Sequence, residues 1–424
     1  MEKSKKAMLL SLLFMGIGQF YNKQYIKGAI YALIEVITLI FGIPYFKKSI
    51  WGLVTLGEVK FHYVNGKAVF DHSLFLMLQG IIALLILAII IIAYISNVYD
   101  AKKNANRMEY KKTTIHDVLD RNFPFIILAP AAVFVMFIVL FPIIFSILIA
   151  FTDFSGPYHL PPRALLNWVG LNNFKDLFKL EIWSGTFYGV FVWTVIWAIL
   201  ATVTTYFVGL FLALLINSNE VKFKKFWRSI IILPYAVPGF ISLLVLRLMF
   251  SGPGPINDWL EAIGLQRVGW LTEPGPAKFV LVLVNMWLGA PYFMALMSSV
   301  LTNISKELYE SADIDGATGV QKFRFITLPM VLYATAPLLI TSFAFNFNNF
   351  NIIYFLADGG PVNPEYQYAG HTDILISWIY KLTLNQQQYH MASVVSIIIF
   401  IIIASISAYS FTQTRSFKEE DLIQ

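Results

Sequence analysis

The chain has 424 residues, of which 58% are hydrophobic, 16% are aromatic and only 13% are charged. A soluble domain carries about twice that share of charged residues, so the composition excludes an ordinary soluble protein and predicts an all-α polytopic membrane protein. The net charge of +6 does not indicate nucleic acid as a partner, because excess Lys and Arg in a membrane protein collects in the cytoplasmic loops. Cysteine is absent, which removes disulfides, thiolate metal sites and a cysteine nucleophile.

The N-terminal segment at residues 7–20 is apolar but too short to cross a bilayer, which takes about 20 residues. Its two glycines and Gln19 weaken it further as a spanning helix. Lysines precede it, as in a signal peptide, but the residues after Gln19 make a poor cleavage site. We expect the segment to be retained and to be interfacial or re-entrant.

Apolar runs long enough to cross a membrane follow in chain order. They lie near residues 26–45, 74–97, 124–151, 186–217, 229–250, 278–300, 330–356 and 391–412. These runs predict about eight transmembrane helices, which places both termini on the same side. Most of the Lys and Arg in the connecting loops lie on that side too, so we expect the N- and C-termini to be cytoplasmic and the protein to be multi-pass in the cell membrane.

The polar connections suggest three regions. Residues 1–123 contain the N-terminal segment, two spans and a polar stretch that is predicted to be a cytoplasmic linker. Residues 124–412 contain six spans, enough for a transport domain, and residues 413–424 form a predicted cytoplasmic tail. No function is predicted for residues 1–123.

A polar segment at residues 301–329 separates the sixth and seventh apolar runs. Leu308, Ala312 and Ile314 recur in it at helical spacing, which predicts a short helix over residues 306–315 with a small apolar face. Such a face fits a groove on another protein. The residues expected to form this docking surface are Glu310, Ser311, Ala312, Asp315 and Gly316.

Two residues of this segment predict where its helices end and begin. Gly316 is expected to end the short helix, because only glycine takes a left-handed conformation without a steric penalty. Pro329 is expected in the first turn of the next membrane helix, where its missing N–H has no cost. The alternative is an ordinary polar loop with one helical turn.

The seventh apolar run contains four amides, at Asn346, Asn348, Asn349 and Asn351. Polar groups in hydrocarbon usually face the helix bundle or a wet cavity. Asn346 and Asn349 are expected to share one helix face beside Phe345. Amides bond to sugar hydroxyls and an aromatic ring covers the apolar face of a sugar, so a sugar site is possible here. The alternative, hydrogen bonding between helices, is preferred for Asn348 and Asn351 and stays open for the other two.

The sixth run carries a second cluster at residues 285–292. Gly289 and Pro291 are expected to interrupt its helix, which frees backbone groups that only protein or a water-filled cavity can satisfy. A proline kink that serves packing is the alternative.

Together these motifs resemble the MalF-type permease subunit of maltose and maltodextrin ABC importers. The segment at residues 310–329 is similar to the E-A-A-x3-G-x9-I-x-L-P coupling loop of importer permeases, with Ser311 in place of the usual Ala. The resemblance covers residues 124–412 and rests on L-G-x-P-Y at 288–292, L-Y-E-S-A-x-x-D-G-A at 308–317, F-N-F-N-N-F at 345–350, G-G-P at 359–361 and A-G-H-T-D at 369–373. One departure is the short loop at residues 152–185, where the best-known relatives have a large outer domain.

The resemblance implies a type I ABC importer permease fold, a six-helix core plus N-terminal helices, that moves maltodextrin-type oligosaccharides inward by alternating access. It implies a second related permease subunit, a cytoplasmic ABC ATPase dimer and an extracytoplasmic sugar-binding protein as partners, besides membrane lipids. By motif alignment it implies a sugar site formed by Leu288, Gly289, Tyr292, Phe345, Asn346 and Asn349. It also assigns coupling to the ATPase to Glu310, Ser311, Ala312, Asp315 and Gly316.

The chain itself is expected to be a transport subunit and not an enzyme. It has no G-x-x-x-x-G-K-[ST] phosphate loop, so ATP and Mg²⁺ are expected on the partner ATPase, with no cofactor or metal bound by this chain. Another neutral sugar is the alternative substrate. An ion-coupled secondary transporter is a weaker alternative, because it would usually place charges in the core and only Glu35 and Arg247 are candidates.

Overall fold

A computed structural model describes most of the chain. The described residues are 3–105, 115–160, 162–218 and 220–412. The expected cytoplasmic tail at residues 413–424 lies outside the described residues, as does part of the expected linker before residue 123.

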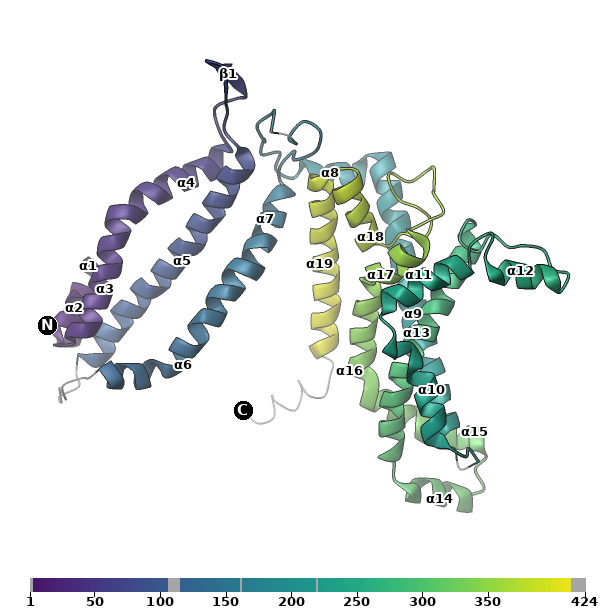
Figure 1. Cartoon of the computed structure of the whole chain (residues 1–424). Helices are drawn as coiled ribbons and strands as arrows, with labels where there is room; N and C mark the ends of the chain where they lie inside the picture. Colours follow the sequence, from purple (N-terminus) through teal and green to yellow (C-terminus); the bar gives the residue numbers. More distant parts are fainter. Residues whose placement is uncertain (1–2, 106–114, 161, 219, 413–424) are drawn as a thin grey trace. The chain divides into compact units, whose positions relative to one another are not determined.

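Contacts divide the chain into two compact units, Met1–Gly170 and Leu171–Gln424. Figure 1 shows the elements of each unit. The boundaries of the expected transport domain at residues 124–412 stay a prediction.

The first unit consists of helices and one small hairpin. Its elements are α1 (Lys3–Leu13), α2 (Ile17–Tyr21), α3 (Tyr25–Ile37), η1 (Thr38–Gly42), α4 (Ile43–Thr55), β1 (His62–Val64), β2 (Lys67–Val69), α5 (Ser73–Asn104), α6 (Ile115–Phe134), η2 (Val135–Leu140) and α7 (Phe141–Ile149). The antiparallel strands β1 and β2 turn at Asn65 and Gly66, which both have positive φ. Asn-Gly is the pair that a two-residue hairpin favours, so the sequence held a signal for this turn.

The second unit is helical and carries the candidate site. Its elements are α8 (Asn172–Lys179), α9 (Glu181–Asn217), α10 (Lys224–Ala236), α11 (Gly239–Met249), α12 (Pro255–Ala262), α13 (Pro274–Thr302), α14 (Lys306–Ile314), α15 (Gly319–Lys322), η3 (Phe323–Thr327), α16 (Leu328–Phe347), α17 (Phe350–Ile352), η4 (Ile353–Ala357), α18 (Leu375–Tyr380), η5 (Lys381–Asn385) and α19 (Tyr389–Thr412).

The expected number of membrane crossings is confirmed. Seven helical stretches in the described residues are long and apolar enough to cross a membrane, and the pair α10 and α11 supplies an eighth. This fifth crossing, expected over residues 229–250, is bent, because α10 and α11 meet at 89°. Pro238 has no N–H and disfavours the helical region for the residue before it, and α10 ends where Val237 is extended (φ −97°, ψ 132°).

Three of the spans contain a proline that follows a widened, π-helical turn. The turns η1, η2 and η3 are each followed within two residues by a proline, namely Pro44, Pro142 and Pro329. A proline ring clashes with the carbonyl four residues earlier and donates no hydrogen bond, and a wider turn relieves both problems. The helix therefore continues through the proline.

This continuity corrects the expectation for Pro329. The seventh span is helical from Gly319 to Phe347, so Pro329 lies inside the helix and not in its first turn. The helix begins instead at a capping box, in which Thr318 and Gln321 satisfy each other's backbone N–H groups.

The pair α9 and α13 forms the centre of the second unit. A Cβ on Gly209 would lie 2.4 Å from the Phe293 Cβ, and a Cβ on Gly289 would lie 2.6 Å from Thr205 Cγ2. Small residues thus permit the close approach that membrane helices use to associate. One apolar cluster joins this pair to α11 and η4, and a second joins it to α16.

Candidate functional site

The short helix expected in the polar segment is confirmed as α14. Ser305 caps its first turn by accepting a hydrogen bond from the Glu307 N–H at 3.3 Å. The helix ends before Gly316, whose φ of +71° lies in the left-handed region. A Cβ there would meet nothing within 4 Å, so the backbone conformation, and not lack of space, requires glycine.

The predicted coupling residues lie together on the surface of α14 and its C-terminal turn. Exposed among them are Glu310, Ser311, Asp315 and Gly316, with Ala312 half-buried. Ile314, beside them, is 88% exposed and adds a large apolar side chain to this surface. Burying such a side chain against a partner is favourable.

One side of α14 is attached to the helix that continues into α16. The Tyr309 hydroxyl and Thr327 Oγ1 form a hydrogen bond of 2.9 Å, and Tyr309 packs against the apolar cluster of α9, α13 and α16. Lys322 Nζ lies 2.6 Å from an Asp313 carboxylate oxygen. Tyr309 is not among the predicted coupling residues, although its place beside Glu310 in the motif was a signal.

The Asn-rich run lies at a helix break. The helix α16 ends at Phe347, and Asn349, with ψ of 75°, stands outside the regular helix before α17. The expected shared helix face of Asn346 and Asn349 is therefore wrong. The Asn348 amide donates to the Ala344 carbonyl at 3.5 Å, the kind of local bond with which Asn competes against helix continuation.

Two cavities of about 290 and 280 Å³ adjoin at this break and share several lining residues. The first is lined by Gly289, Tyr292, Phe345 and Asn346, and the second by Leu288, Gly289, Phe345 and Asn349. The structure thus brings the six predicted sugar-site residues to one place. Their contact with a sugar stays a prediction.

Two further residues, Tyr235 and Asn285, line both cavities. Tyr235 lies near the end of α10, just before the bend between α10 and α11. In the sequence, the two prolines Pro234 and Pro238 indicate that a bend could occur there. Asn285 is an amide within a membrane helix, which by itself marks a residue that faces the bundle.

Hydrogen bonds orient the cavity amides. Asn285 donates to Thr205 Oγ1 at 3.3 Å and accepts from the Asn349 amide at 3.5 Å. Asn346, which is 4% exposed, donates to Thr202 Oγ1 at 3.0 Å. Asn346 thus forms the bond between helices that one interpretation predicts, and it also lines a cavity, while its contact with a sugar stays a prediction.

Aromatic rings supply the rest of the wall. Phe345 is 67% exposed and Tyr292 is 45% exposed, so each ring has a free face. No charged side chain is found among the described residues that line the two cavities. Amides and hydroxyls beside open ring faces suit a neutral, polar ligand that also has apolar faces.

The helix α13 runs without interruption from Pro274 to Thr302, so the expected break at Gly289 and Pro291 is wrong. Pro291 is buried inside the helix. Gly289 serves the close approach of α13 to Thr205 on α9 and also forms part of the cavity wall.

A larger cavity of about 570 Å³ lies among α9, α10, α11 and α13. Aliphatic and aromatic side chains line it, among them Leu212, Leu246 and Met286. It offers few partners to a hydroxyl-rich ligand, so its greater size does not make it the better candidate for a polar substrate.

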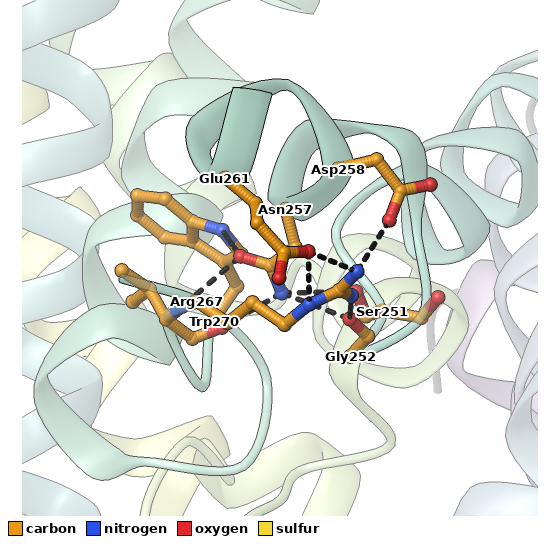
Figure 2. Close-up of polar contacts among 8 residues, drawn as sticks. Ser251, Gly252, Asn257, Asp258, Glu261, Arg267 and Trp270 are labelled. Carbon is orange, nitrogen blue, oxygen red and sulfur yellow. Dashed lines mark hydrogen bonds and ion pairs between the residues drawn. The ribbon is translucent and has the colours of Figure 1, made fainter. Parts of the chain in front are cut away.

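The loop between α11 and α13 is held by a polar cluster (Figure 2). Asn257 Oδ1 accepts from Trp270 Nε1 at 3.1 Å, and Arg267 forms ion pairs of 2.7 Å with Asp258 and 2.8 Å with Glu261. The cluster fixes the short helix α12 to the loop that follows it.

A buried carboxylate organises the loop between η4 and α18. Asp373 accepts hydrogen bonds from Lys381 Nζ at 2.7 Å, the Gly370 N–H at 2.6 Å and Ser377 Oγ at 2.8 Å. Lys381 also donates to the Asp358 carbonyl at 2.8 Å. Burial raises the pKa of the Asp373 carboxyl, and the ammonium of Lys381 opposes that rise.

These features, which are eight membrane crossings, polar cavities and an exposed short helix α14 in a polar loop, are those of a polytopic transport subunit. A family model for the binding-protein-dependent transport system inner membrane component matches residues 205–414. The chain is 39% identical to the galactooligosaccharides transport system permease protein GanP of Bacillus subtilis (strain 168), over 99% of this chain and 100% of that protein. It is 38% identical to the maltodextrin transport system permease protein MdxF of the same organism, over 100% of this chain and 98% of that protein.

A solved structure agrees with this result. A chain in the crystal structure of a bacterial ABC transporter involved in the import of the acidic polysaccharide alginate is 25% identical, with a TM-score of 0.57 over 71% of this chain and 98% of that one. The chain therefore belongs to the family of binding-protein-dependent transport system inner membrane components. It is a multi-pass permease subunit of an ABC importer, and the alternative of an ion-coupled secondary transporter is set aside.

Proposed function

We propose that this permease carries neutral oligosaccharides of the maltodextrin type into the cell. The observation that carries the proposal is the uncharged pair of cavities at the break in span seven, where Asn285, Asn346 and Asn349 lie beside the open rings of Tyr292 and Phe345. Oligosaccharides present hydroxyls to amides and C–H faces to rings. The name of the relative MdxF, a maltodextrin permease, supports the same substrate class.

Galactooligosaccharides are the second candidate substrate. The relative GanP is named for them, at an identity of 39% against 38% for MdxF. Both sugar classes are neutral and rich in hydroxyls, so the chemistry of the cavity wall accepts either. The shape of the cavity decides between them.

The proposal includes the partners that such an importer needs. The chain lacks a phosphate loop, so ATP and Mg²⁺ would be bound by a cytoplasmic ATPase dimer that docks on α14 through Glu310, Ser311, Ala312, Asp315 and Gly316. A second related permease would supply the second docking helix. An extracytoplasmic binding protein would deliver sugar on the opposite side of the membrane.

Alternating access would then use the break in span seven. The contact of Tyr309 with Thr327 joins the docking helix to the start of the helix that continues into α16, and α16 ends at the cavities. Movement of α14 by the ATPase would thus reach the cavity wall through one continuous helix. Because Asn349 stands outside the regular helix, α16 would tilt in this movement without carrying η4 with it.

Uptake into proteoliposomes tests the proposal. The vesicles would hold this chain with its partner permease and ATPase, with ATP inside and the binding protein outside. ATP-dependent entry of labelled maltotriose that needs every component is the expected result. Entry of a galactooligosaccharide alone would replace the maltodextrin assignment, and entry of neither sugar despite ATP turnover would refute the sugar class.

A further inference from the structure

The N-terminal helix α1 has its apolar face turned outward. Its buried face consists of Ser4, Ala7 and Ser11, whereas Leu9, Leu12 and Leu13 are 45%, 43% and 80% exposed. Small and polar residues facing a neighbouring helix, with large apolar residues facing away, form the pattern of a helix in contact with lipid. The helix has 11 residues, too few to cross a bilayer.

Buried hydrogen bonds hold this helix to the end of α5. Asn97 Oδ1 accepts from the Gly16 N–H at 3.0 Å, and the Asn97 amide donates to the Ser11 carbonyl at 3.1 Å. Gln19 donates to the Asn97 carbonyl at 2.8 Å, and Gln19 and Asn97 are fully buried. Gly18 has no room for a Cβ, which would lie 2.3 Å from the Ala7 carbonyl oxygen.

The same packing brings together lysines from three segments. Ser4 Oγ donates to the Lys102 carbonyl at 3.2 Å, and the Asn22 amide donates to the Ala101 carbonyl at 2.8 Å. The N-terminus of α1 and the residue after Asn22 therefore lie at the C-terminal end of α5. The exposed lysines at this end, called the lysine surface below, are Lys3, Lys5, Lys6, Lys23, Lys102 and Lys103.

Among the residues that the structure describes, the acidic side chain at this end of α5 pairs with a lysine outside the lysine surface. Asp100, at the same end of α5, forms an ion pair of 2.9 Å with Lys27, which is not one of these six lysines. Lys6 lies 5.4 Å from the Tyr21 ring centroid and Lys103 lies 5.6 Å from that of Tyr99, so rings support two of the ammonium groups. Like charges that the fold gathers in this way repel one another unless an external anion lies among them.

We propose that the lysine surface binds the headgroups of anionic phospholipids while the leucines of α1 contact the acyl chains. A basic cluster beside an exposed apolar helix face is the combination that anchors a segment at the surface of an anionic membrane. Nucleic acid would also pair with the lysines but offers nothing to the leucines. The inference concerns residues 3–103 and does not depend on the transported substrate.

A fluorescent probe on α1 tests this inference. The chain has no cysteine, so Leu13→Cys in the full chain gives a single labelling site on the exposed face. The labelled protein would be reconstituted in phosphatidylcholine vesicles that contain a small fraction of brominated phosphatidylglycerol or brominated phosphatidylcholine. Stronger quenching by the phosphatidylglycerol, weakened by salt, is the expected result.

Charge variants then identify the residues. Each lysine near an anionic lipid contributes a factor of about five to the preference for phosphatidylglycerol over phosphatidylcholine. Lys5→Gln/Lys6→Gln/Lys103→Gln should therefore lower this preference by on the order of a hundredfold. The matched control Lys47→Gln/Lys48→Gln/Lys60→Gln removes three exposed lysines outside the lysine surface and should leave the preference for phosphatidylglycerol unchanged. The corresponding Lys→Arg triple variant should retain the preference and shows that the labelled protein still folds.

Three results would overturn the inference. These are equal quenching by the two brominated lipids in the protein with all its lysines, an unchanged preference in the Gln triple variant, and loss of the preference in the Arg triple variant. A preference for added oligonucleotide over phosphatidylglycerol would assign the surface to nucleic acid instead.

Discussion

At the scale of single residues, the same side chain often serves both packing and the site. Asn346 bonds to Thr202 on α9 and lines a cavity. Gly289 permits close packing of α13 against Thr205 on α9 and also forms part of the cavity wall. A membrane interior offers no water to a polar group, so an amide that serves a ligand must also have a partner within the protein. Sequence alone therefore could not choose between the two roles of Asn346.

Removing a cavity amide should weaken sugar uptake. Asn349→Ala should raise the half-saturating sugar concentration about fivefold, since a hydrogen bond to a ligand is worth on the order of 1 kcal/mol. Uptake into proteoliposomes with varied maltotriose measures this effect. Asn348→Ala is the matched control, because its exposed amide bonds only weakly, to the Ala344 carbonyl. An equal effect of both substitutions would return Asn349 to a packing role.

Reversing charge on α14 should uncouple the ATPase. Glu310→Lys changes an exposed carboxylate on the proposed docking surface, so we expect the ATPase to stop co-purifying while membrane insertion is unaffected. The loss should exceed that of Glu310→Gln, which removes the charge without reversing it. Normal ATPase recovery with the Lys variant would remove Glu310 from the docking surface.

Breaking the buried ion pair should destabilise the second unit. Lys381→Met leaves Asp373 unpaired and fully buried, which costs about 3–5 kcal/mol for pairs of this kind. Burial raises the pKa of Asp373, and the loss of the Lys381 ammonium raises it further. The loss in free energy of unfolding is therefore largest at pH values above the pKa of Asp373 in the folded protein. It decreases as the pH falls and the carboxyl is protonated. Thermal unfolding in detergent at several pH values measures it. Lys322→Met, at an exposed pair, should have little effect at any pH.

At the scale of elements, prolines set the shape of the spans in two opposite ways. Pro238 bends the fifth span by ending α10, whereas Pro329 is accommodated by the widened turn η3 and leaves its helix continuous. The local sequence shows a proline in both cases. The difference depends on whether the preceding residue is held in the helical or the extended region, and packing of the neighbouring helices decides that.

The end of the coupling helix depends on one glycine. Gly316→Ala would place a Cβ on a residue with φ of +71° and should cost about 1 kcal/mol, which shifts or frays the end of α14. ATP turnover stimulated by binding protein should fall more than ATPase binding does. Gly319→Ala is the matched control, because that glycine lies in the first turn of α15 with open space around it. Equal losses in the two variants would show that the conformation of Gly316 is not what matters.

At the scale of the whole molecule, the helix count and the loop charges agree on one topology. Both termini, the linker before the third span and α14 are expected on the cytoplasmic side, with the hairpin β1 and β2 on the other. Lysines near residues 47–67 weaken the charge bias for the first two spans, so the orientation rests mainly on the later loops.

Cysteine labelling in cells tests this topology. Because the chain has no cysteine, Ile314→Cys and Lys67→Cys each give a single exposed thiol. A membrane-impermeant maleimide added outside should label Lys67→Cys at once and Ile314→Cys only after the membrane is opened. Val362→Cys, 84% exposed in the loop after η4, should behave as Lys67→Cys does. The reverse pattern would invert the proposed orientation.

The sequence by itself determined the membrane class, the eight crossings, the helix of the coupling loop and the glycine that ends it, since hydrophobic length and glycine conformation act locally. Only the tertiary structure placed Asn349 outside a helix, brought Tyr235 to the same cavities as Asn285, and carried a helix through Pro329. These outcomes depend on contacts between residues far apart in the chain, such as that of Asn285 with Thr205, and no local pattern specifies them. The physical reason is that a buried polar group must find a partner wherever the packed helices place one.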